Sequence, residues 1–184
     1  MQFKQILALA LAGTAVASPI QAVVDSVAGA QDLATIQAAF ASVEAALTTL
    51  DTSIKGLTAP GTEAATKKIT DESDAVKKAL DDGSAKIAAS GPVSLTEALQ
   101  VQVASNKLTG LTSTVITDLI AKKDIIVGAK QAKTTVDSLT GQKTAAENFV
   151  KAISGKVPTG VQTIAQAASK SVGDSLAKGI AAFS

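Results

Sequence analysis

The sequence predicts an all-α protein, an antiparallel bundle of about five long amphipathic helices that follows a cleaved signal peptide. Apolar residues recur at steps of three and four along most of the chain, which is the period of an amphipathic helix. Short turns with Gly or Pro separate these stretches, and no segment shows the alternation and composition of a β-strand. Because the turns are short, we expect successive helices to be antiparallel. An extended coiled coil is the alternative architecture, and the frequent turns argue against it.

The N-terminus has the three parts of a secretory signal peptide in the right order. Lys4 charges the head, Ile6–Ala12 is an unbroken apolar run, and Ala15–Ala17 fits the small-x-small rule of signal peptidase. We therefore expect residues 1–17 to be a signal peptide and residues 18–184 to form a single helical-bundle domain. The alternative is a short buried helix at the N-terminus. The apolar run is also too short to span a bilayer, which takes roughly 20 apolar residues.

A first helix is predicted by one apolar stripe without a gap. Its members recur at steps of three and four: Leu33, Ile36, Phe40, Val43, Leu47, Leu50, Ile54 and Leu57. Three valines further upstream lie on a different phase, so we expect a bend or break near Gly29 and a shorter lead-in helix before it. The segment 58–61, which contains Pro and Gly, ends the helix.

The second and third helices begin at recognisable capping residues. Thr62 is placed to cap the second helix, in which lysines and aspartates fill the outer face beside a stripe of Ile69, Val76, Leu80 and Ile87. After a turn at 90–92, Ser94 and Glu97 form a capping box. The third helix then carries the stripe Val101, Ala104, Leu108, Leu111, Val115 and Leu119.

A change of phase at 122–124 separates the fourth helix from the third. The fourth stripe comprises Ile125, Ala129, Ala132, Val136, Leu139, Ala146, Val150 and Ile153. Lys143 interrupts it, and we expect that side chain to snorkel to solvent. After a turn at 155–158, Pro158 suits the start of a fifth helix, whose stripe is Val161, Ile164, Ala168, Val172, Leu176, Ile180 and Phe183.

The composition argues against an enzyme. The chain has no Cys, His, Trp or Tyr, which excludes Ser–His and Cys–His nucleophile systems and an ordinary zinc site. The adjacent acidic pairs, Asp71–Glu72 and Asp81–Asp82, lie among Lys and small polar residues, as on a solvated helix face. We expect no catalytic residues, no metal site and no cofactor. A hydrolase that works through a pair of carboxylates is the enzyme alternative.

Charge and aromatic content argue against nucleic-acid binding. The formal net charge is +1, every positive charge is a lysine, and loss of Lys4 with the signal peptide leaves the mature chain near zero. Such a chain lacks the basic excess that meets phosphates and, at 2% aromatic residues, the surface that stacks bases. A net charge near zero also weakens repulsion between molecules and favours adsorption.

The apolar stripes allow two interpretations. In the first, every stripe residue is core. In the second, sparse large side chains among Ala, Ser and Thr leave a lengthwise apolar channel for an acyl chain, or the bundle lays its inner faces on an apolar surface. The hydroxyls beside the stripes, at Thr35, Thr48, Ser73, Thr112 and Thr135, either bond back to their own helix or face a ligand head group. Our candidate binding residues are Phe40, Leu47, Leu80, Leu111, Val115, Leu119, Val136, Phe149, Ile153, Ile164, Leu176 and Phe183.

Three short patterns give the chain a family resemblance. Leu50-Asp51-x-x-Ile54, the junction 121–123 and the turn 156–158, together with the signal peptide, resemble the fungal hydrophobic surface-binding protein A family, which includes cell-wall galactomannoproteins. The resemblance implies a secreted, non-catalytic bundle that adsorbs to hydrophobic surfaces and recruits hydrolases to them. It also implies that fatty acids can bind inside the bundle, as they do in relatives with the same domain.

Surface adsorption is therefore the function we expect first, and an extracellular fatty-acid carrier is the alternative. The expected partners are hydrophobic solid surfaces, or fatty acids and lipids, with a secreted esterase as a further candidate. A purely structural bundle that docks another protein is a third hypothesis. We expect no transmembrane anchoring, because no second long apolar run follows the signal peptide and no lipid-anchor tail ends the chain. The protein should be extracellular or loosely associated with the cell wall.

Overall fold

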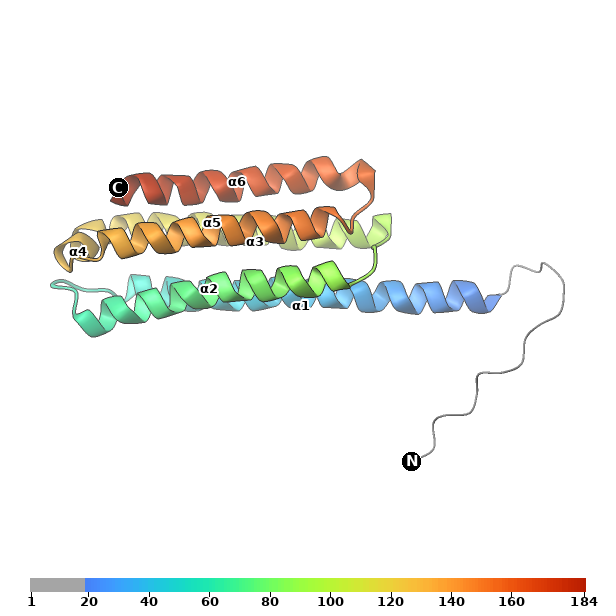
Figure 1. The fold of residues 1–184 in the computed structure, drawn as a ribbon, viewed down its shortest axis with the longest axis horizontal. Coiled ribbons are helices and arrows are strands. Elements are labelled where there is room, and N and C mark those ends of the chain that lie inside the picture. The colour runs from blue at the N-terminus through green and yellow to red at the C-terminus, as the bar shows by residue number, and fades with distance from the viewer. Residues whose placement is uncertain (1–18) are drawn as a thin grey trace, which may run out of the picture.

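The computed structural model describes residues 19–184, with the side chains of 31–163 and 166–184, and its regular elements in that range are all helices. The helices (Figure 1) are α1 Pro19–Lys55, α2 Glu63–Ala89, α3 Leu95–Ala121, α4 Lys123–Gly128, α5 Ala132–Ser154 and α6 Thr159–Phe183. The all-α bundle with five long helices is thus confirmed. The signal peptide expected at residues 1–17 lies outside the described residues.

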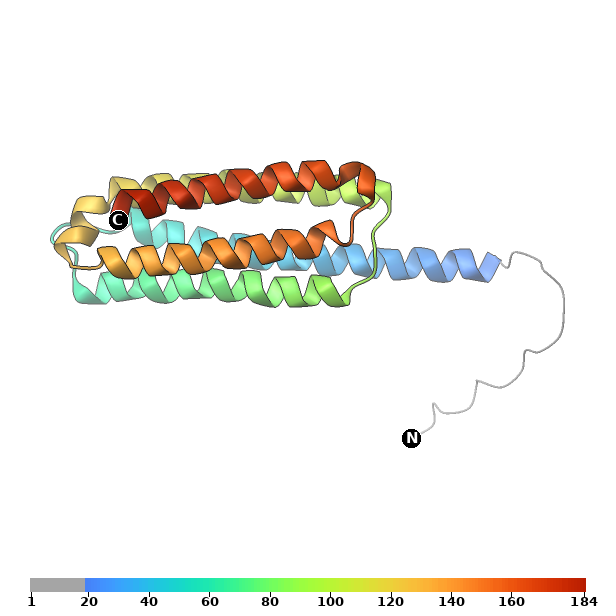
Figure 2. The same cartoon turned by 45° about the horizontal axis from the view of Figure 1, so that its top comes forward.

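The five long helices form a closed ring. Each packs mainly against two others, in the order α1, α2, α5, α6, α3 and back to α1. Helices that follow one another in the chain run in opposite directions, as the short turns predicted (Figures 1 and 2). They are not always neighbours in space, however, because α1 lies between α2 and α3, and α6 lies between α3 and α5. Three neighbouring pairs are consequently parallel: α1 with α3, α3 with α6, and α2 with α5.

Connecting segments close both ends of the ring. At one end the α2–α3 connection buries Val93, whose N–H donates to the carbonyl of Lys156 in the α5–α6 connection at 2.9 Å. At the other end α4 contacts α3 and α6 and buries Ile126. There the Lys122 Nζ donates to a carbonyl of the α1–α2 connection, that of Leu57, at 2.8 Å.

The predicted caps are confirmed at α2 and α3. Thr62 Oγ1 accepts from the backbone N–H of Ala65 at 3.2 Å. At α3, Ser94 Oγ accepts from the N–H of Glu97 at 3.3 Å while the Glu97 carboxylate accepts from the N–H of Ser94 at 2.8 Å. These bonds satisfy backbone donors that the first turn of a helix leaves free.

Two expectations about helix boundaries were wrong. The helix α1 continues through Gly29 without a break, because one glycine costs only about 1 kcal/mol in a helix interior and alanines flank it. The fourth predicted helix is two helices, since α4 ends at Gly128 and α5 begins at Ala132. Lys130, between them, has a φ of 60°, in the left-handed region that no helix tolerates.

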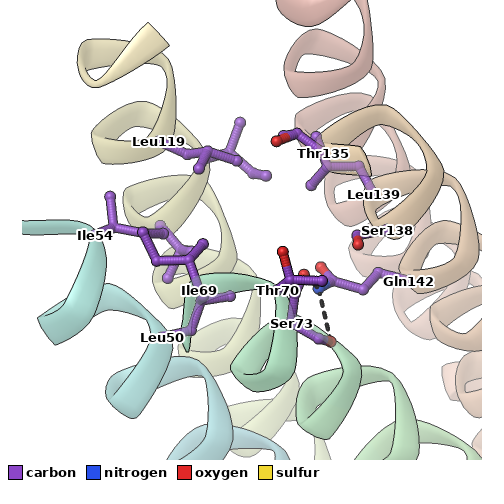
Figure 3. A pocket seen from close by; sticks show the side chains of 12 residues that line it. Leu50, Ile54, Ile69, Thr70, Ser73, Leu119, Thr135, Ser138, Leu139 and Gln142 are labelled. Carbon is purple, nitrogen blue, oxygen red and sulfur yellow. Dashed lines mark hydrogen bonds between the residues drawn. The ribbon is translucent and has the colours of Figure 1, made fainter. Parts of the chain in front are cut away.

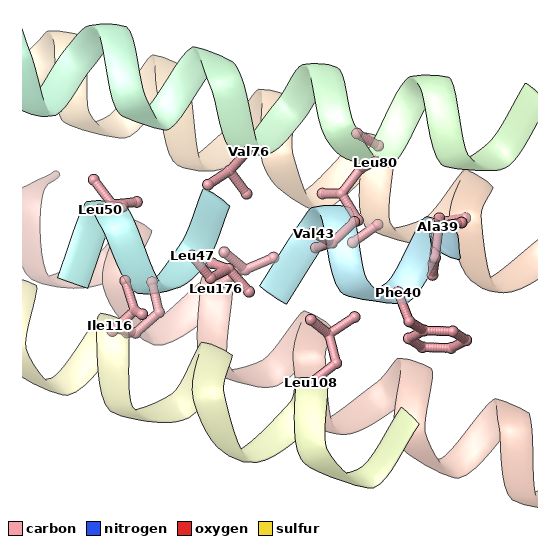
Figure 4. Close-up of a cluster of buried hydrophobic side chains, with 14 of the residues drawn as sticks. Ala39, Phe40, Val43, Leu47, Leu50, Val76, Leu80, Leu108, Ile116 and Leu176 are labelled. Carbon is pink, nitrogen blue, oxygen red and sulfur yellow. The ribbon is translucent and has the colours of Figure 1, made fainter. Parts of the chain in front are cut away.

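The core lies along the ring axis and is almost wholly aliphatic (Figure 4). Its aromatic centre is Phe149 of α5, which meets Phe40 of α1 edge to face with ring centroids 5.2 Å apart. Gly83 of α2 makes room for this ring, because a Cβ at that position would lie 2.7 Å from the Phe149 Cε2. One segment of the described chain, Gln31–Lys55, is long and apolar enough to cross a membrane, but its stripe packs into this core.

Candidate functional site

Four cavities adjoin one another along the inside of the ring. Each is partly open to solvent, and the free space within it is enough for only a few water molecules at most. Each shares a lining side chain of α5 with the next: Gln142 joins the first and second, Phe149 the second and third, and Ile153 the third and fourth. Positions 135–153 of α5 line the whole series, which spans about 27 Å at 1.5 Å per residue.

The first cavity has one polar wall (Figure 3). Thr70 and Ser73 of α2 and Thr135, Ser138 and Gln142 of α5 line that wall. The opposite wall is aliphatic and comes from α1 and α3. We call these five polar residues the polar cluster.

Gln142 is the buried centre of the polar cluster, with 4% of its surface exposed. Its Nε2 donates to the Ser73 Oγ at 2.6 Å and to the Ser73 carbonyl at 3.1 Å, which links α5 to α2. A buried amide and a buried hydroxyl would be costly without partners, so this pair stabilises the parallel α2–α5 contact.

The hydroxyls singled out in the sequence divide into two groups. Thr35, Thr48, Thr112 and Thr135 each donate to the carbonyl four residues earlier in their own helix. Ser73 instead accepts from Gln142 on another helix. Only Ser73 of the five therefore has a hydroxyl committed to a contact between helices.

The second to fourth cavities are lined mainly by aliphatic side chains and Phe149. The second receives residues from all five long helices, including Leu47, Leu80 and Leu176. The third and fourth lie between α3, α5 and α6. Thr112 is buried at the second cavity with its hydroxyl bonded within α3. Ser105 and Thr109 also line the third cavity, and Gln102 and Ser105 the fourth, so a chain of methylene groups would meet mainly apolar surface with some polar side chains.

Eight of the predicted binding residues line these cavities: Phe40, Leu47, Leu80, Val115, Leu119, Phe149, Ile153 and Leu176. Leu111 and Val136 are partly buried against the core, and Phe183 is buried near the end of α6, away from the four cavities. The side chain of Ile164 lies outside the described residues. Whether any of them contacts a ligand stays a prediction.

Sequence reasoning missed Gln142. The sequence analysis treats position 143 as an interruption of the fourth stripe, whereas the structure buries Gln142 on that face and leaves Lys143 partly exposed. The signal was available, because Leu139, Gln142, Ala146, Phe149 and Ile153 recur at steps of three and four. A search for apolar residues alone skips a buried amide.

The outer surfaces of α2 and α3 differ in charge. Lysines and aspartates cover α2 and pair at i, i+4, as Lys77 does with Asp81 at 2.6 Å. The α3 stripe, which we define as Leu95, Leu99 and Val103, is apolar, and these side chains are 59%, 55% and 69% exposed. Residues four apart share one helix face, so the three form a continuous exposed patch.

An ionic cluster joins α1 to α3 near the first cavity. Lys55 Nζ lies 2.5 Å from an oxygen of Asp51 and 3.4 Å from an oxygen of Asp118. The hydrogen bond that Lys55 donates to Asp51, opposed by desolvation and assisted by Asp118, raises the pKa of Lys55 above its ordinary value. Within the described part of the chain, no three acidic side chains gather as a metal site would need.

Comparison with known proteins identifies relatives of the chain. Residues 33–155, from α1 to the turn after α5, match the family described as hydrophobic surface binding protein A. A cell wall mannoprotein 1 of Aspergillus flavus is 31% identical over 183 residues, which cover 100% of this chain and 63% of the relative. One from Aspergillus fumigatus is 40% identical over 95 residues, or 51% of this chain and 34% of the relative. The chain thus spans less than two thirds of these relatives.

Solved structures share the fold. Ligand binding domain 1 of the Penicillium marneffei MP1 protein, complexed with arachidonic acids, aligns with a TM-score of 0.79 at 29% identity and covers 83% of this chain and 99% of that domain. AFMP4P in complex with palmitic acid also aligns with a TM-score of 0.79, over 83% of this chain and 99% of the other, but its 16% identity supports the fold alone.

Proposed function

Because the chain belongs to the hydrophobic surface binding protein A family, we propose that it is a fatty-acid-binding protein that holds an acyl chain inside its ring of helices. The observation that carries the proposal is the series of four adjoining cavities, lined mainly by apolar side chains and with the polar cluster around the buried Gln142 at the first of them. Ligand pockets commonly combine a large apolar lining with a few placed polar groups. The arachidonic-acid complex of the similar MP1 domain supports the same choice.

In this proposal the head group lies at the polar cluster and the tail extends toward the fourth cavity. Gln142 and Ser73 can exchange their mutual hydrogen bond for bonds to a carboxyl group. Leu108 and Phe149 line both the second and the third cavity, so we expect these side chains to change rotamer when a long tail occupies both.

Co-purification and titration test the proposal. Native mass spectrometry of the secreted protein should show bound fatty acids, and delipidated protein should bind added palmitate or arachidonate. Ala146→Phe fills the second cavity and should abolish binding, whereas Ala85→Phe on the exposed face of α2 should not. Thermal unfolding of both variants separates lost binding from lost folding. A delipidated wild type that binds neither fatty acid would refute the proposal.

The head-group position has its own test. Gln142→Leu should weaken binding of a fatty acid about tenfold, since one hydrogen bond to a charged group contributes about 1.5 kcal/mol or more. Binding of the methyl ester of the same acid should fall less. Equal losses for acid and ester would place the head group elsewhere.

A second candidate function is adsorption to hydrophobic solid surfaces with recruitment of a secreted hydrolase. The exposed α3 stripe and the family's description favour it. Retention on alkane-coated beads in moderate salt, compared with an ordinary secreted helical protein, tests adsorption. A pull-down with a secreted esterase tests recruitment. In both versions the protein itself is non-catalytic, and turnover of a generic ester by the pure protein would contradict this.

Both functions place the protein outside the cell, free or loosely held in the wall. The cell wall mannoproteins among its relatives support this location. N-terminal sequencing of the secreted protein should begin at Ser18, with residues 1–17 removed and residues 18–184 retained as one bundle domain. A start elsewhere would correct the predicted boundary.

A further inference from the structure

The inner cavities are reached most easily through the side of the bundle. At one end of the ring, the buried Val93 and its bond to the Lys156 carbonyl close the opening. At the other end, the buried Ile126 and the bond from Lys122 do the same. Entry through either end would break these contacts and expose buried aliphatic surface, which is unfavourable.

Most sides of the ring are linked by polar contacts between helices. Between α1 and α3, Gln37 Nε2 donates to Gln100 Oε1 at 3.1 Å, and Lys107 pairs with Glu44 at 2.6 Å. The contact of α2 with α5 has the Gln142–Ser73 pair. The contact between α5 and α6 also has a polar link, at the turn that connects them, where Gln162 Nε2 donates to the Ser154 carbonyl at 3.2 Å.

The contact between α3 and α6 has no such link. Among the described residues, no side-chain hydrogen bond or ion pair joins these two helices. The side chains of α6 that line the third and fourth cavities, Val161, Ala168 and Val172, are small and only partly buried. No described residue of 159–175 is buried. The first half of α6 is thus the part of the cavity wall whose displacement should cost the least free energy.

The helices α3 and α6 are neighbours that start at the same end of the bundle (Figures 1 and 2), so the α3 stripe, on the solvent face of the first half of α3, lies in the same half of the molecule as this wall. Charge is sparse around it. Lys107, the exposed lysine one turn beyond Val103, pairs with Glu44 of α1 at 2.6 Å, and the exposed Asn106 of α3 and Thr163, Gln166 and Ala167 of α6 are uncharged. A surface with sparse charge and exposed aliphatic side chains favours contact with hydrocarbon over contact with a charged partner.

We propose that the α3–α6 contact is a lateral portal and that the α3 stripe docks it on an interface of packed acyl chains, such as a lipid surface. Three side chains cover too little area for a stable protein complex, which buries roughly 1,200 Å² or more, but each leucine can bury its surface in lipid independently. The proposal rests on the fatty-acid-binding function proposed above. A fatty acid leaves such an interface head first, passes between α3 and α6, and carries its head group on to the polar cluster while the tail fills the cavities behind it.

The first test measures transfer from a lipid surface. Anthroyloxy-palmitate is supplied in phosphatidylcholine vesicles that carry a non-exchangeable quencher lipid, and uptake is followed as recovered fluorescence. Leu99→Lys should slow uptake about tenfold, because a leucine that enters hydrocarbon contributes about 1.5 kcal/mol or more. Thr114→Lys adds the same charge to the exposed face of α3 outside the stripe and should leave the rate unchanged. Affinity for the ligand added without vesicles should be the same in both variants.

The second test closes the portal. The chain has no cysteine, so Cys pairs introduced for Ser105 and Ala168, which line the third cavity from α3 and α6, can be joined by a short bis-maleimide cross-linker. A matched pair at Gln37 and Gln100 joins α1 to α3 instead. The first cross-link should stop uptake, and the second should permit it.

The outcomes separate the two proposals. Equal uptake by the two cross-linked proteins, or by Leu99→Lys and Thr114→Lys, overturns the portal while equilibrium binding by the wild type upholds the fatty-acid function. A wild type that binds no fatty acid in either format overturns the function itself, and the portal with it.

Discussion

The helices α2 and α3 have the same length of 27 residues, and both present an apolar stripe to the same core, yet their outer faces are opposites. Nine charged side chains are exposed along α2: Glu63, Lys67, Lys68, Asp71, Asp74, Lys77, Lys78, Asp82 and Lys86. Along α3 the exposed face carries one, Lys107, beside the aliphatic stripe. The comparison shows that the inner apolar stripe specifies the fold, whereas the outer face of each helix is free to differ according to whether it contacts water or an apolar partner.

The largest expected difference in the free energy of unfolding is between alanine substitutions at two glycines, one in each helix. Gly83→Ala should destabilise the protein by about 1–3 kcal/mol, because the new Cβ would lie 2.7 Å from the Phe149 ring and the packed core must shift. Gly110→Ala should stabilise it by about 0.5–1 kcal/mol, since no atom beyond its own helix backbone and chain neighbours lies within 4 Å of that Cβ and alanine favours a helix. Urea unfolding of both variants measures the two changes.

The two substitutions are predicted to change the free energy of unfolding in opposite directions. If both substitutions stabilised the protein, the intrinsic preference of alanine for helices would outweigh packing at Gly83. The contact with Phe149 would then be looser than the structure indicates.

A smaller difference in stability is expected between substitutions at the two N-caps. Ser94→Ala at α3 should cost about 1 kcal/mol, and more than Thr62→Ala at α2, because the capping box satisfies two backbone donors and the single threonine satisfies one. Thermal unfolding measures both, with the exposed Ser113→Ala on α3 as control. Equal losses at the two caps would mean that Glu97 contributes nothing to the box.

The smallest effect concerns the ion pairs of α2. The hydrogen bond from Lys78 lowers the pKa of Asp82 below its ordinary value of 3.8. A lowered pKa means that the pair's contribution to stability is present at neutral pH and is lost as pH falls through the folded-state pKa. Lys78→Gln should move the Asp82 titration, followed by NMR of the side-chain carboxyl, back toward the ordinary value. Added salt should do so partly. An unchanged titration in Lys78→Gln would show that the two side chains are not paired in solution.

Much of the fold could be predicted from the sequence because local rules determine it. Periodicity gave the five long helices, and the residue types at Thr62 and Ser94 gave two helix starts that the structure confirms. The break assigned at Gly29 failed because a phase change in apolar residues does not terminate a helix when every residue remains compatible with it.

The site was less predictable, because it depends on which helices become neighbours. The α2–α5 contact brings Ser73 to Gln142 across 69 positions of sequence, and no local pattern encodes that pairing. The same limit applies to the contact between α3 and α6, where the absence of polar links among the described side chains is visible only once the ring order is known. Exposure of Leu95 and Leu99 likewise required the structure, since leucine in a helix is ordinarily placed in the core.

The odd number of helices in the ring has an electrostatic consequence. Each helix carries a dipole equivalent to roughly half a positive charge at its N-terminus and half a negative charge at its C-terminus. Three long helices (α1, α3 and α6) run one way and two (α2 and α5) run the other, so their dipoles cannot cancel. The excess, about half a unit charge, adds positive potential at the end where α3 and α6 begin. An anionic interface therefore attracts this end of the helix backbones, from which the α3 stripe begins, and added salt weakens the attraction.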